Sequence, residues 1–303
     1  MLISYWLSLV VVCAPMASQE PDIAAIVNGH VISLDRVDRY LKKTLGAKKL
    51  TGIQKSVARL EAAKHLVNRH LVFAEIADSA EIGEPQVAFE LSRLTDRLAE
   101  VDQTLEQYLA ENKISKDELL YEFRWRLAWA KYLKKKLTDE RLELFFKKHQ
   151  RKFDGTRMQV AHILFADSEA SMQQAGVVRE KIQSGEVSWV DAAKKCSIAS
   201  SSAEQGGEIG WITYDGPMVP DFCQAAMKLQ NDEISEPVKT NFGIHLIKCL
   251  KIEPGKIGPM DVKLELREEA TQFLFDTLAA KNRSAAKIDI RLPDPIVDQS
   301  TKK

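Results

Sequence analysis

Two of the six histidines stand where an imidazole could take part in chemistry. His162 lies in the apolar run VAHILF and His245 in the run GIHLIK, and both runs have the composition of short strands. A neutral imidazole donates a hydrogen bond from one ring nitrogen, accepts one at the other, and titrates near physiological pH. Taken one at a time, each histidine is better explained as a hydrogen-bonded core residue.

Other kinds of catalytic chemistry find little support. Neither GxSxG nor HExxH occurs, and Cys196 has no suitable general base beside it. No further histidine or cysteine stands at ligand spacing from His162 or His245, so neither a metal site nor a cofactor is expected. Cys196, Cys223 and Cys249 form no CxxC pair. Free thiols are the favoured interpretation, and one disulfide with a spare thiol is the alternative.

The composition favours a globular protein of two domains. The chain has 303 residues, of which 45% are hydrophobic and 28% charged, as expected for a chain that buries a core. Lys and Arg together number 43, as do Asp and Glu. This balance argues against a nucleic-acid or anionic-membrane binder, which would need net or clustered positive charge. We interpret the basic run 134–136 as a solvated helix face.

Residues 1–18 have the character of a secretory signal peptide. An apolar stretch over residues 3–12 is too short for a transmembrane span, and small residues follow at Ala14, Ala17 and Ser18. No Lys or Arg precedes the stretch, and Pro15 sits near the expected cleavage site, so the pattern is not typical in every respect. We predict an exported protein, periplasmic or otherwise extracytoplasmic and soluble after cleavage, with lipid attachment at Cys13 as the weaker alternative.

Helical patterns dominate residues 22–136. The Asn28-Gly29 dipeptide predicts a tight turn between two short β-prone runs, and Ser33 then has the position of a helix N-cap. Two later helices open on capping boxes, Thr104 with Gln107 and Ser115 with Glu118. We therefore predict a mostly helical domain over 22–136. A linker helix over 137–156 follows it and ends at the turn dipeptide Asp154-Gly155.

Residues 157–252 have a different pattern, with strand, helix, helix, glycine-rich loop, strand, helix and strand in that order. The second of these strands precedes an amphipathic helix predicted over 218–228. The order predicts a small antiparallel sheet with packed helices, and the whole chain is α+β. Residues 259–292 are predicted to form a helix and a short strand, and 293–303 a polar tail.

Four segments of this second region together resemble the parvulin family of peptidyl-prolyl cis-trans isomerases. In chain order they are VAHILF, GGEIGW, MVPDFCQAAMKL and EISEPVKTNFGIHLIK. The flanking segments IVNGHVISLDRVDRYL and LTDERLELFFKKHQRKF are similar to parts of exported foldases of the SurA/PrsA type. The resemblance implies a parvulin domain over 157–252. It also implies a chaperone-like N-terminal domain on which residues 259–292 pack.

The resemblance implies isomerase and chaperone activity on unfolded or proline-containing polypeptides. The X–Pro amide has a rotation barrier of about 20 kcal/mol. An apolar site favours the twisted amide, because the planar amide is more polar and loses more on leaving water. Residues that match the family's proline pocket are Ile209, Met218, Phe222 and Phe242. The alternative is that Met218 and Phe222, four positions apart, are ordinary core residues of a helix.

The same resemblance assigns His162 and His245 to a neutral, hydrogen-bonded pair that shapes the site and does not attack the substrate. The family commonly carries Asp or Cys where this chain has Ala199 and Ser200. Ser200 is then the nearest polar substitute and a weaker acceptor, so low activity is expected. The alternatives are a catalytically silent domain in a peptide-binding chaperone and a structural protein with one fixed partner. The loop ADSEASMQQ has no basic residue, so no phosphopeptide preference is expected.

Overall fold

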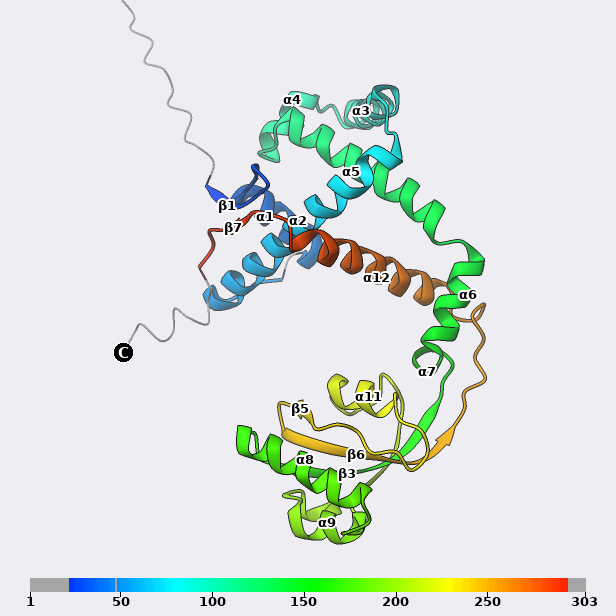
Figure 1. Cartoon of the computed structure of the whole chain (residues 1–303). Helices are drawn as coiled ribbons and strands as arrows, with labels where there is room; N and C mark the ends of the chain where they lie inside the picture. Colours follow the sequence, from blue (N-terminus) through cyan, green and yellow to red (C-terminus); the bar gives the residue numbers. More distant parts are fainter. Residues whose placement is uncertain (1–21, 47, 294–303) are drawn as a thin grey trace, which may run out of the picture. The chain divides into compact units, whose positions relative to one another are not determined.

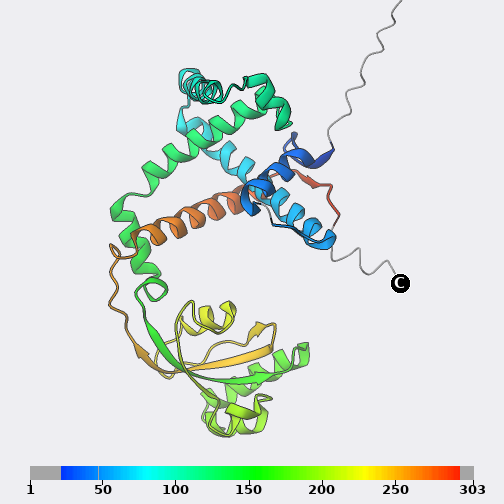
Figure 2. The ribbon, with the colours of Figure 1, turned by 180° about the vertical axis from the view of Figure 1, so that it is seen from behind.

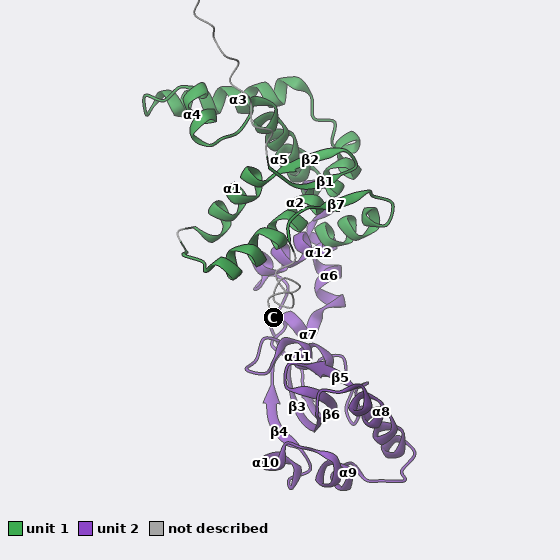
Figure 3. Cartoon of the chain, turned by 90° about the vertical axis from the view of Figure 1, so that its left-hand side faces the viewer, with its two compact units in different colours: residues 1–133, 274–303 green, residues 134–273 purple. Residues whose placement is uncertain are grey.

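The structure is a computed structural model that describes residues 22–46 and 48–293. The signal peptide predicted over 1–18 and nearly all of the predicted polar tail lie outside these residues. The chain divides into two compact units (Figure 3). The first holds residues up to 133 and those from 274 onward, and the second holds residues 134–273. Each unit has its own sheet and its own core.

The first unit is mostly helical. Its helices are α1 (Leu34–Leu45), α2 (Gly52–Ala80), α3 (Glu84–Ala99), α4 (Leu105–Glu111), most of α5 (Lys116–Lys136) and the second half of α12 (Lys263–Arg283). Side chains cap the helices as predicted: Ser33 Oγ accepts from the backbone N–H of Arg36, and Thr104 and Gln107 form a capping box. None of the described helices combines the length and the apolar composition needed to cross a lipid bilayer.

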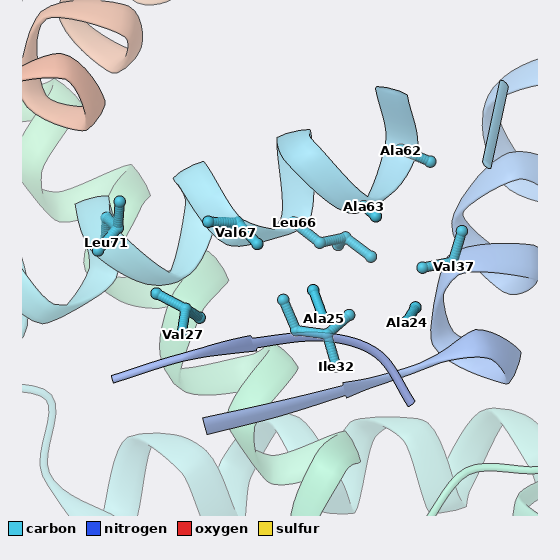
Figure 4. Packing of buried hydrophobic residues seen from close by; sticks show 10 residues of the cluster. All are labelled: Ala24, Ala25, Val27, Ile32, Val37, Ala62, Ala63, Leu66, Val67 and Leu71. Atoms are coloured by element: carbon cyan, nitrogen blue, oxygen red, sulfur yellow. The ribbon is translucent and has the colours of Figure 1, made fainter. Parts of the chain in front are cut away.

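A three-stranded antiparallel sheet completes the first unit. Its strands, in the order β2-β1-β7, are β2 (His30–Ser33), β1 (Ile23–Val27) and β7 (Ile288–Ile290). The Asn28-Gly29 turn has φ of 50° and 84°, the left-handed pair that the dipeptide predicts. Figure 4 shows Val27 and Ile32 of this sheet facing α2, with Val27 opposite Val67 and Ile32 opposite Leu66. The first unit therefore has a sheet-on-helix core.

The second unit contains the sheet that carries the two histidines. Its elements are α6 (Asp139–Lys148), α7 (Gln150–Phe153), β3 (Arg157–Phe165), α8 (Glu169–Gln183), α9 (Trp189–Cys196), α10 (Ser200–Ala203), β4 (Glu208–Ile212), α11 (Pro220–Ala226), β5 (Val238–Thr240) and β6 (Gly243–Glu253). The sheet has the order β4-β3-β6-β5, and all neighbours are antiparallel. The chain is thus α+β, as the sequence predicts.

The two faces of this sheet have different cores. Alternate residues of β3 point to opposite faces. Ala161, Ile163 and Phe165 join a cluster with residues of α8 and α9, whereas Met158 and Val160 join a cluster with residues of α11. Figures 1 and 2 show α11 on one face of the sheet and α8 and α9 on the other. His162 continues the series of Met158 and Val160, so the fold directs it toward the α11 face.

Three predicted elements differ in the structure. The helix predicted over 218–228 spans only Pro220–Ala226, because Pro220 suits the first turn and disfavours helix in the residue before it. Met218 therefore lies outside the helix. The linker helix breaks at His149, whose φ and ψ of −116° and 27° separate α6 from α7. The loop before the glycine pair contains the single helical turn α10, and β5 has no counterpart in the sequence pattern.

The cysteines of the described residues, Cys196, Cys223 and Cys249, are free thiols, which confirms the favoured interpretation. Cys223 and Cys249 are buried, and Cys196 is partly buried.

Candidate functional site

The two histidines lie on adjacent strands at the centre of the second unit's sheet. The β3–β6 register pairs His162 with Ile247 and Leu164 with His245, so the histidines are diagonal neighbours on one face. Their Nδ1 atoms lie 3.3 Å apart, and their rings are stacked with centroids 5.5 Å apart. Only 7% of His162 and 3% of His245 is exposed. Residues distant in the sequence thus form a buried imidazole pair.

A hydroxyl group stands at each end of the pair. Ser202 Oγ lies 3.3 Å from Nε2 of His162, and Thr240 Oγ1 lies 2.9 Å from Nε2 of His245. Thr240 Oγ1 also accepts the backbone N–H of Phe242 at 3.1 Å. All four ring nitrogens of the two histidines therefore have a partner, and the polar atoms form one line from Ser202 to Thr240.

This line of hydrogen bonds can order its protons in two ways. In the first, His162 donates through Nδ1 to His245, and His245 donates through Nε2 to Thr240. In the second, Thr240 donates to His245, His245 donates to His162, and His162 donates to Ser202. A backbone carbonyl lies 3.3 Å from Ser202 Oγ and another 3.5 Å from Thr240 Oγ1, so the hydroxyl not used as a donor to a ring has an acceptor. Both arrangements leave both rings neutral.

Burial and proximity keep the pair uncharged. Burial lowers the pKa of His162. Burial, together with the neighbouring His162, lowers the pKa of His245 from 6.5 to about 4. The Nδ1 atoms face each other, and two protons cannot occupy the space between them. Near neutral pH, the site is therefore a neutral hydrogen-bonded pair with no full charge.

Apolar side chains surround the pair on the α11 face. The ring of Phe222 meets both imidazoles edge-on, with centroids 6.0 Å from His162 and 5.3 Å from His245, and it is fully buried. Ile209 and Met218 are partly buried and pack against the cluster that contains Phe222. Of the four predicted substrate-contacting residues, Phe222 therefore contacts both histidines, and Ile209 and Met218 pack against its cluster.

Phe242, the fourth of these residues, is placed differently. Its side chain is 65% exposed and lies outside that cluster. Its backbone N–H is nevertheless fixed by Thr240, which contacts His245. Phe242 can therefore contribute an exposed aromatic surface on the turn between β5 and β6.

The structure brings Ser202, and not Ser200, to the histidine pair. Ser200 is exposed and opens the turn α10, whereas Ser202 is partly buried and its hydroxyl reaches His162. Two positions along a helical turn rotate the side chain to a different side, so a prediction from distance along the sequence selects the wrong serine for this contact. Thr240 was also missed. Its signal is the turn sequence TNFG, which returns the chain into β6 directly opposite Thr240.

A close backbone approach fixes the loop that carries Ser202. Gly207 has φ of 77°, and its carbonyl accepts the backbone N–H of His162 at 2.8 Å. A Cβ at Gly207 would lie 2.0 Å from the His162 carbonyl oxygen, so only glycine fits. The glycine pair of the GGEIGW motif thus serves to hold the serine-bearing loop against β3.

Other reactive groups near the pair are poorly suited to covalent chemistry. Burial raises the pKa of the Cys223 thiol, which lies next to Phe222 in α11, so the thiol stays protonated. Within residues 22–46 and 48–293, no group of three or more His, Cys, Asp or Glu side chains is arranged to hold a metal ion. The arrangement is suited to binding an apolar group above a neutral polar line.

Comparison with known proteins agrees with this arrangement. Residues 162–251 match the Rotamase family, described as the PPIC-type PPIASE domain. The chain is 31% identical over 210 residues to the foldase protein PrsA of Bacillus subtilis. The aligned region covers 64% of this chain and 67% of PrsA. It is 37% identical over 144 residues to the chaperone SurA of Cupriavidus metallidurans. That aligned region covers 44% of this chain and 28% of SurA.

The fold and site define a parvulin-type peptidyl-prolyl isomerase domain. The chain belongs to the parvulin family that includes the foldase PrsA. It spans 28% and 67% of the lengths of the two curated relatives above. Among solved structures, PrsA from Bacillus cereus is 23% identical, with a TM-score of 0.35, and the match covers 94% of this chain and all of that one.

Proposed function

We propose that this chain is a peptidyl-prolyl cis-trans isomerase that also binds unfolded polypeptides and assists the folding of exported proteins. The observation that carries the proposal is the neutral His162–His245 pair, buried under Phe222. Family membership and the two relatives named as foldase and chaperone support it. The apolar segment 1–18 supports export as part of the same proposal.

In this proposal, the site lowers the barrier by its polarity. Rotation about an X–Pro bond breaks no covalent bond, and the twisted amide has lost resonance and charge separation. Ile209, Met218 and Phe222 provide an apolar surface for the proline ring, and Phe242 covers it from the β5–β6 turn. The histidines orient and polarise this surface without carrying charge. The twisted amide therefore loses less than the planar one on leaving water.

The hydroxyls fix the histidines in this proposal. Ser202 takes the place that the sequence suggested for Ser200, because its hydroxyl reaches His162. Thr240 has the equivalent position at His245. Both act as positioning residues, since each contacts a ring and not the reacting amide.

We further propose that the first unit holds unfolded segments while the isomerase domain acts. The proposed holding domain has the bounds that the sequence predicts, 22–136 completed by 259–292, and so extends beyond the compact first unit, while a linker helix covers 137–156 and the parvulin domain 157–252. The pairing of β7 with β1 supports this division, because the C-terminal strand completes the first unit's sheet.

An isomerisation assay on the full chain tests the proposal. The exchange rate of a short peptide with one Ala-Pro bond is measured by NMR with and without protein. We expect acceleration that falls at least fivefold in Met218→Ala. The matched control is Met172→Ala, since Met172 is also partly buried but packs against the cluster on the opposite face of the sheet.

The outcomes separate the alternatives. Absence of any acceleration by the wild-type chain would leave a peptide-binding chaperone without isomerase activity. Equal losses in Met218→Ala and Met172→Ala would remove the assignment of the proline site to the α11 face. Suppression of aggregation of several unrelated unfolded proteins would argue against a structural protein with one fixed partner.

A further inference from the structure

A concave site in the isomerase unit, lined by residues other than the histidine pair and the proline-site residues, is strongly basic. It has a volume of about 530 Å³ and lies between the α6–α7 segment and the end of α11. The cationic residues that line it are Lys147, Lys148, Arg151, Lys152 and Lys228, with His149, Gln150, Tyr214, Gln224, Met227 and Gln230 as the other lining residues. None of the lining residues is acidic. We call this the basic pocket. The net positive charge of this pocket contrasts with the charge of the whole chain, in which 43 Lys and Arg residues balance 43 Asp and Glu residues.

Two of the five cations are used by the fold itself. Arg151 donates to the backbone carbonyls of Met227 and Leu229 at 2.9 and 2.6 Å, and so holds the α7 segment to the end of α11. Lys152 forms an ion pair with Glu269 at 2.7 Å. These contacts explain why a basic residue stands at 151 and 152. The Arg151 bonds also fix the two walls of the basic pocket to each other.

The other three cations are not held by ion pairs, although Lys148 Nζ lies over the Phe273 ring, 5.8 Å from its centroid. Lys147, Lys148 and Lys228 are exposed, and none of them forms an ion pair with another described residue. Lys147 and Lys148 stand in the last turn of α6, where a helix favours positive charge by a few tenths of a kcal/mol. That preference accounts for lysines at one helix end. It does not account for the convergence of lysines from two different segments on one cavity.

His149 gives a second, independent indication. It lines the basic pocket, and its Nε2 atom is buried without a hydrogen-bond partner among residues 22–46 and 48–293. Its ring is packed against Phe145, with centroids 4.5 Å apart. Burial and the nearby Lys148 and Lys152 lower its pKa, so the ring is neutral. His149 therefore adds to the lining of the basic pocket a neutral ring whose Nε2 hydrogen-bonding capacity is unused by the described residues.

We propose that the basic pocket binds an acidic stretch of an extended polypeptide client. Lysine ammonium groups would pair with Glu or Asp side chains, while the amides of Gln150, Gln224 and Gln230 suit the peptide backbone. The volume exceeds what a single small anion would fill. This inference rests on the proposed function and names its client class: polypeptides with acidic residues near a proline.

One helix connects this pocket to the proline site. Phe222 and Ala226 on the buried side of α11 belong to the cluster at the histidine pair. Gln224, in the same helix, and Lys228, two residues after its end, line the basic pocket. A client held by its acidic residues would therefore be positioned by the element that also forms the floor of the proline site.

Binding of two peptides to the full chain tests the inference. Both contain one Ala-Pro bond and a flexible Gly-Ser spacer, and one carries four Glu where the other carries four Gln. We expect the Glu peptide to bind at least tenfold more tightly at low salt, with the difference reduced at high salt. In Lys147→Gln/Lys148→Gln, its dissociation constant should rise about fivefold, and Lys228→Gln should add a further two- to threefold.

The matched control is Lys194→Gln/Lys195→Gln. This pair also consists of adjacent exposed lysines in the last turn of a helix, α9, and removes the same charge. It should leave the affinity for the Glu peptide within twofold of the wild type. A second readout is the His149 ring, whose NMR signals should shift when the Glu peptide binds and not when the Gln peptide binds.

Three results would overturn the assignment of the basic pocket to acidic polypeptide clients. Equal affinities for the two peptides would overturn the inference, as would equal losses in the two double variants. Binding of inorganic tripolyphosphate at the same lysines, without preference for the Glu peptide, would overturn the assignment to polypeptide. Isomerisation of the Gln peptide is measured in parallel. Its absence would count against the proposed function and leave the binding result independent.

Discussion

Replacing Thr240 by Val should destabilise the isomerase unit strongly, although the two side chains have nearly the same shape. Thr240 is only 5% exposed. Its Oγ1 lies within hydrogen-bond distance of Nε2 of His245, at 2.9 Å. It also accepts a hydrogen bond from the backbone N–H of Phe242 at 3.1 Å. Valine would leave both of these groups without a partner. Each unsatisfied buried group costs about 1–3 kcal/mol, so for the two groups we expect a loss of roughly 2–6 kcal/mol in the free energy of unfolding.

The matched variant is Thr240→Ser, which keeps the hydroxyl and removes only a methyl group. Loss of that methyl should cost about 1 kcal/mol. Urea unfolding of both variants, followed by the fluorescence of Trp189 and Trp211 in the same unit, measures the difference. NMR of the His245 ring provides a second measurement. Its Nε2 should lose its hydrogen-bonded shift in the valine variant and keep it in the serine variant.

The expected order is therefore wild type, Thr240→Ser, Thr240→Val, with the larger step between the two variants. An unfolding midpoint of Thr240→Val equal to that of the wild type would show that the hydroxyl makes no net contribution and would refute the description of a continuous line from Ser202 to Thr240. A loss in the serine variant as large as that in the valine variant would show that the methyl group contributes as much as the hydroxyl, against the expected order.

Three more results are expected, from lowering the pH, from replacing Gly207, and from replacing the serine hydroxyls. The folded-state pKa of His245 is about 4 and the unfolded value is 6.5, so the unfolded state binds the proton first. Stability should be fully present above pH 6.5 and fall by roughly 3 kcal/mol as the pH drops to about 4; an NMR titration of the ring with a midpoint near 6.5 would contradict this. Gly207→Ala should cost roughly 3–5 kcal/mol by urea unfolding, whereas Gly210→Ala, with φ of 89° and open space around its Cβ, should cost only about 1–2 kcal/mol. Ser202→Ala should lower the isomerisation kcat/KM by about fivefold while Ser200→Ala leaves it unchanged, and the reverse order would restore Ser200 as the relevant hydroxyl.

Local sequence signals predicted much of the fold correctly. The Asn28-Gly29 turn, the Ser33 cap and the box formed by Thr104 and Gln107 depend on neighbours within a few residues, so the sequence alone determines them. The same holds for β3 and β6, whose apolar composition is visible in VAHILF and GIHLIK. The diagonal placement of the two histidines then depends only on the antiparallel register.

Features that depend on distant contacts were not predictable in this way. The single turn α10 exists because Gly207 returns the loop to β3, and that turn decides which serine reaches His162. The position of Met218 outside α11 follows from Pro220, a local signal that the spacing of Met218 and Phe222 concealed. Full burial of Phe222 depends on the cluster around it, which residues of three strands and one helix form.

The family commonly carries Asp or Cys where this chain has Ala199 and Ser200. The hydroxyls of Ser202 and Thr240 explain how the histidine pair is satisfied without that group. A carboxylate at that place would accept from His162 permanently, fix the direction of the whole line of hydrogen bonds, and favour a protonated pair. A hydroxyl can donate or accept, so Ser202 and Thr240 satisfy the pair in either proton arrangement and stabilise no charge. The mechanism proposed above needs an apolar, neutral surface and no proton transfer, because amide rotation breaks no bond. The absence of a carboxylate is therefore compatible with catalysis.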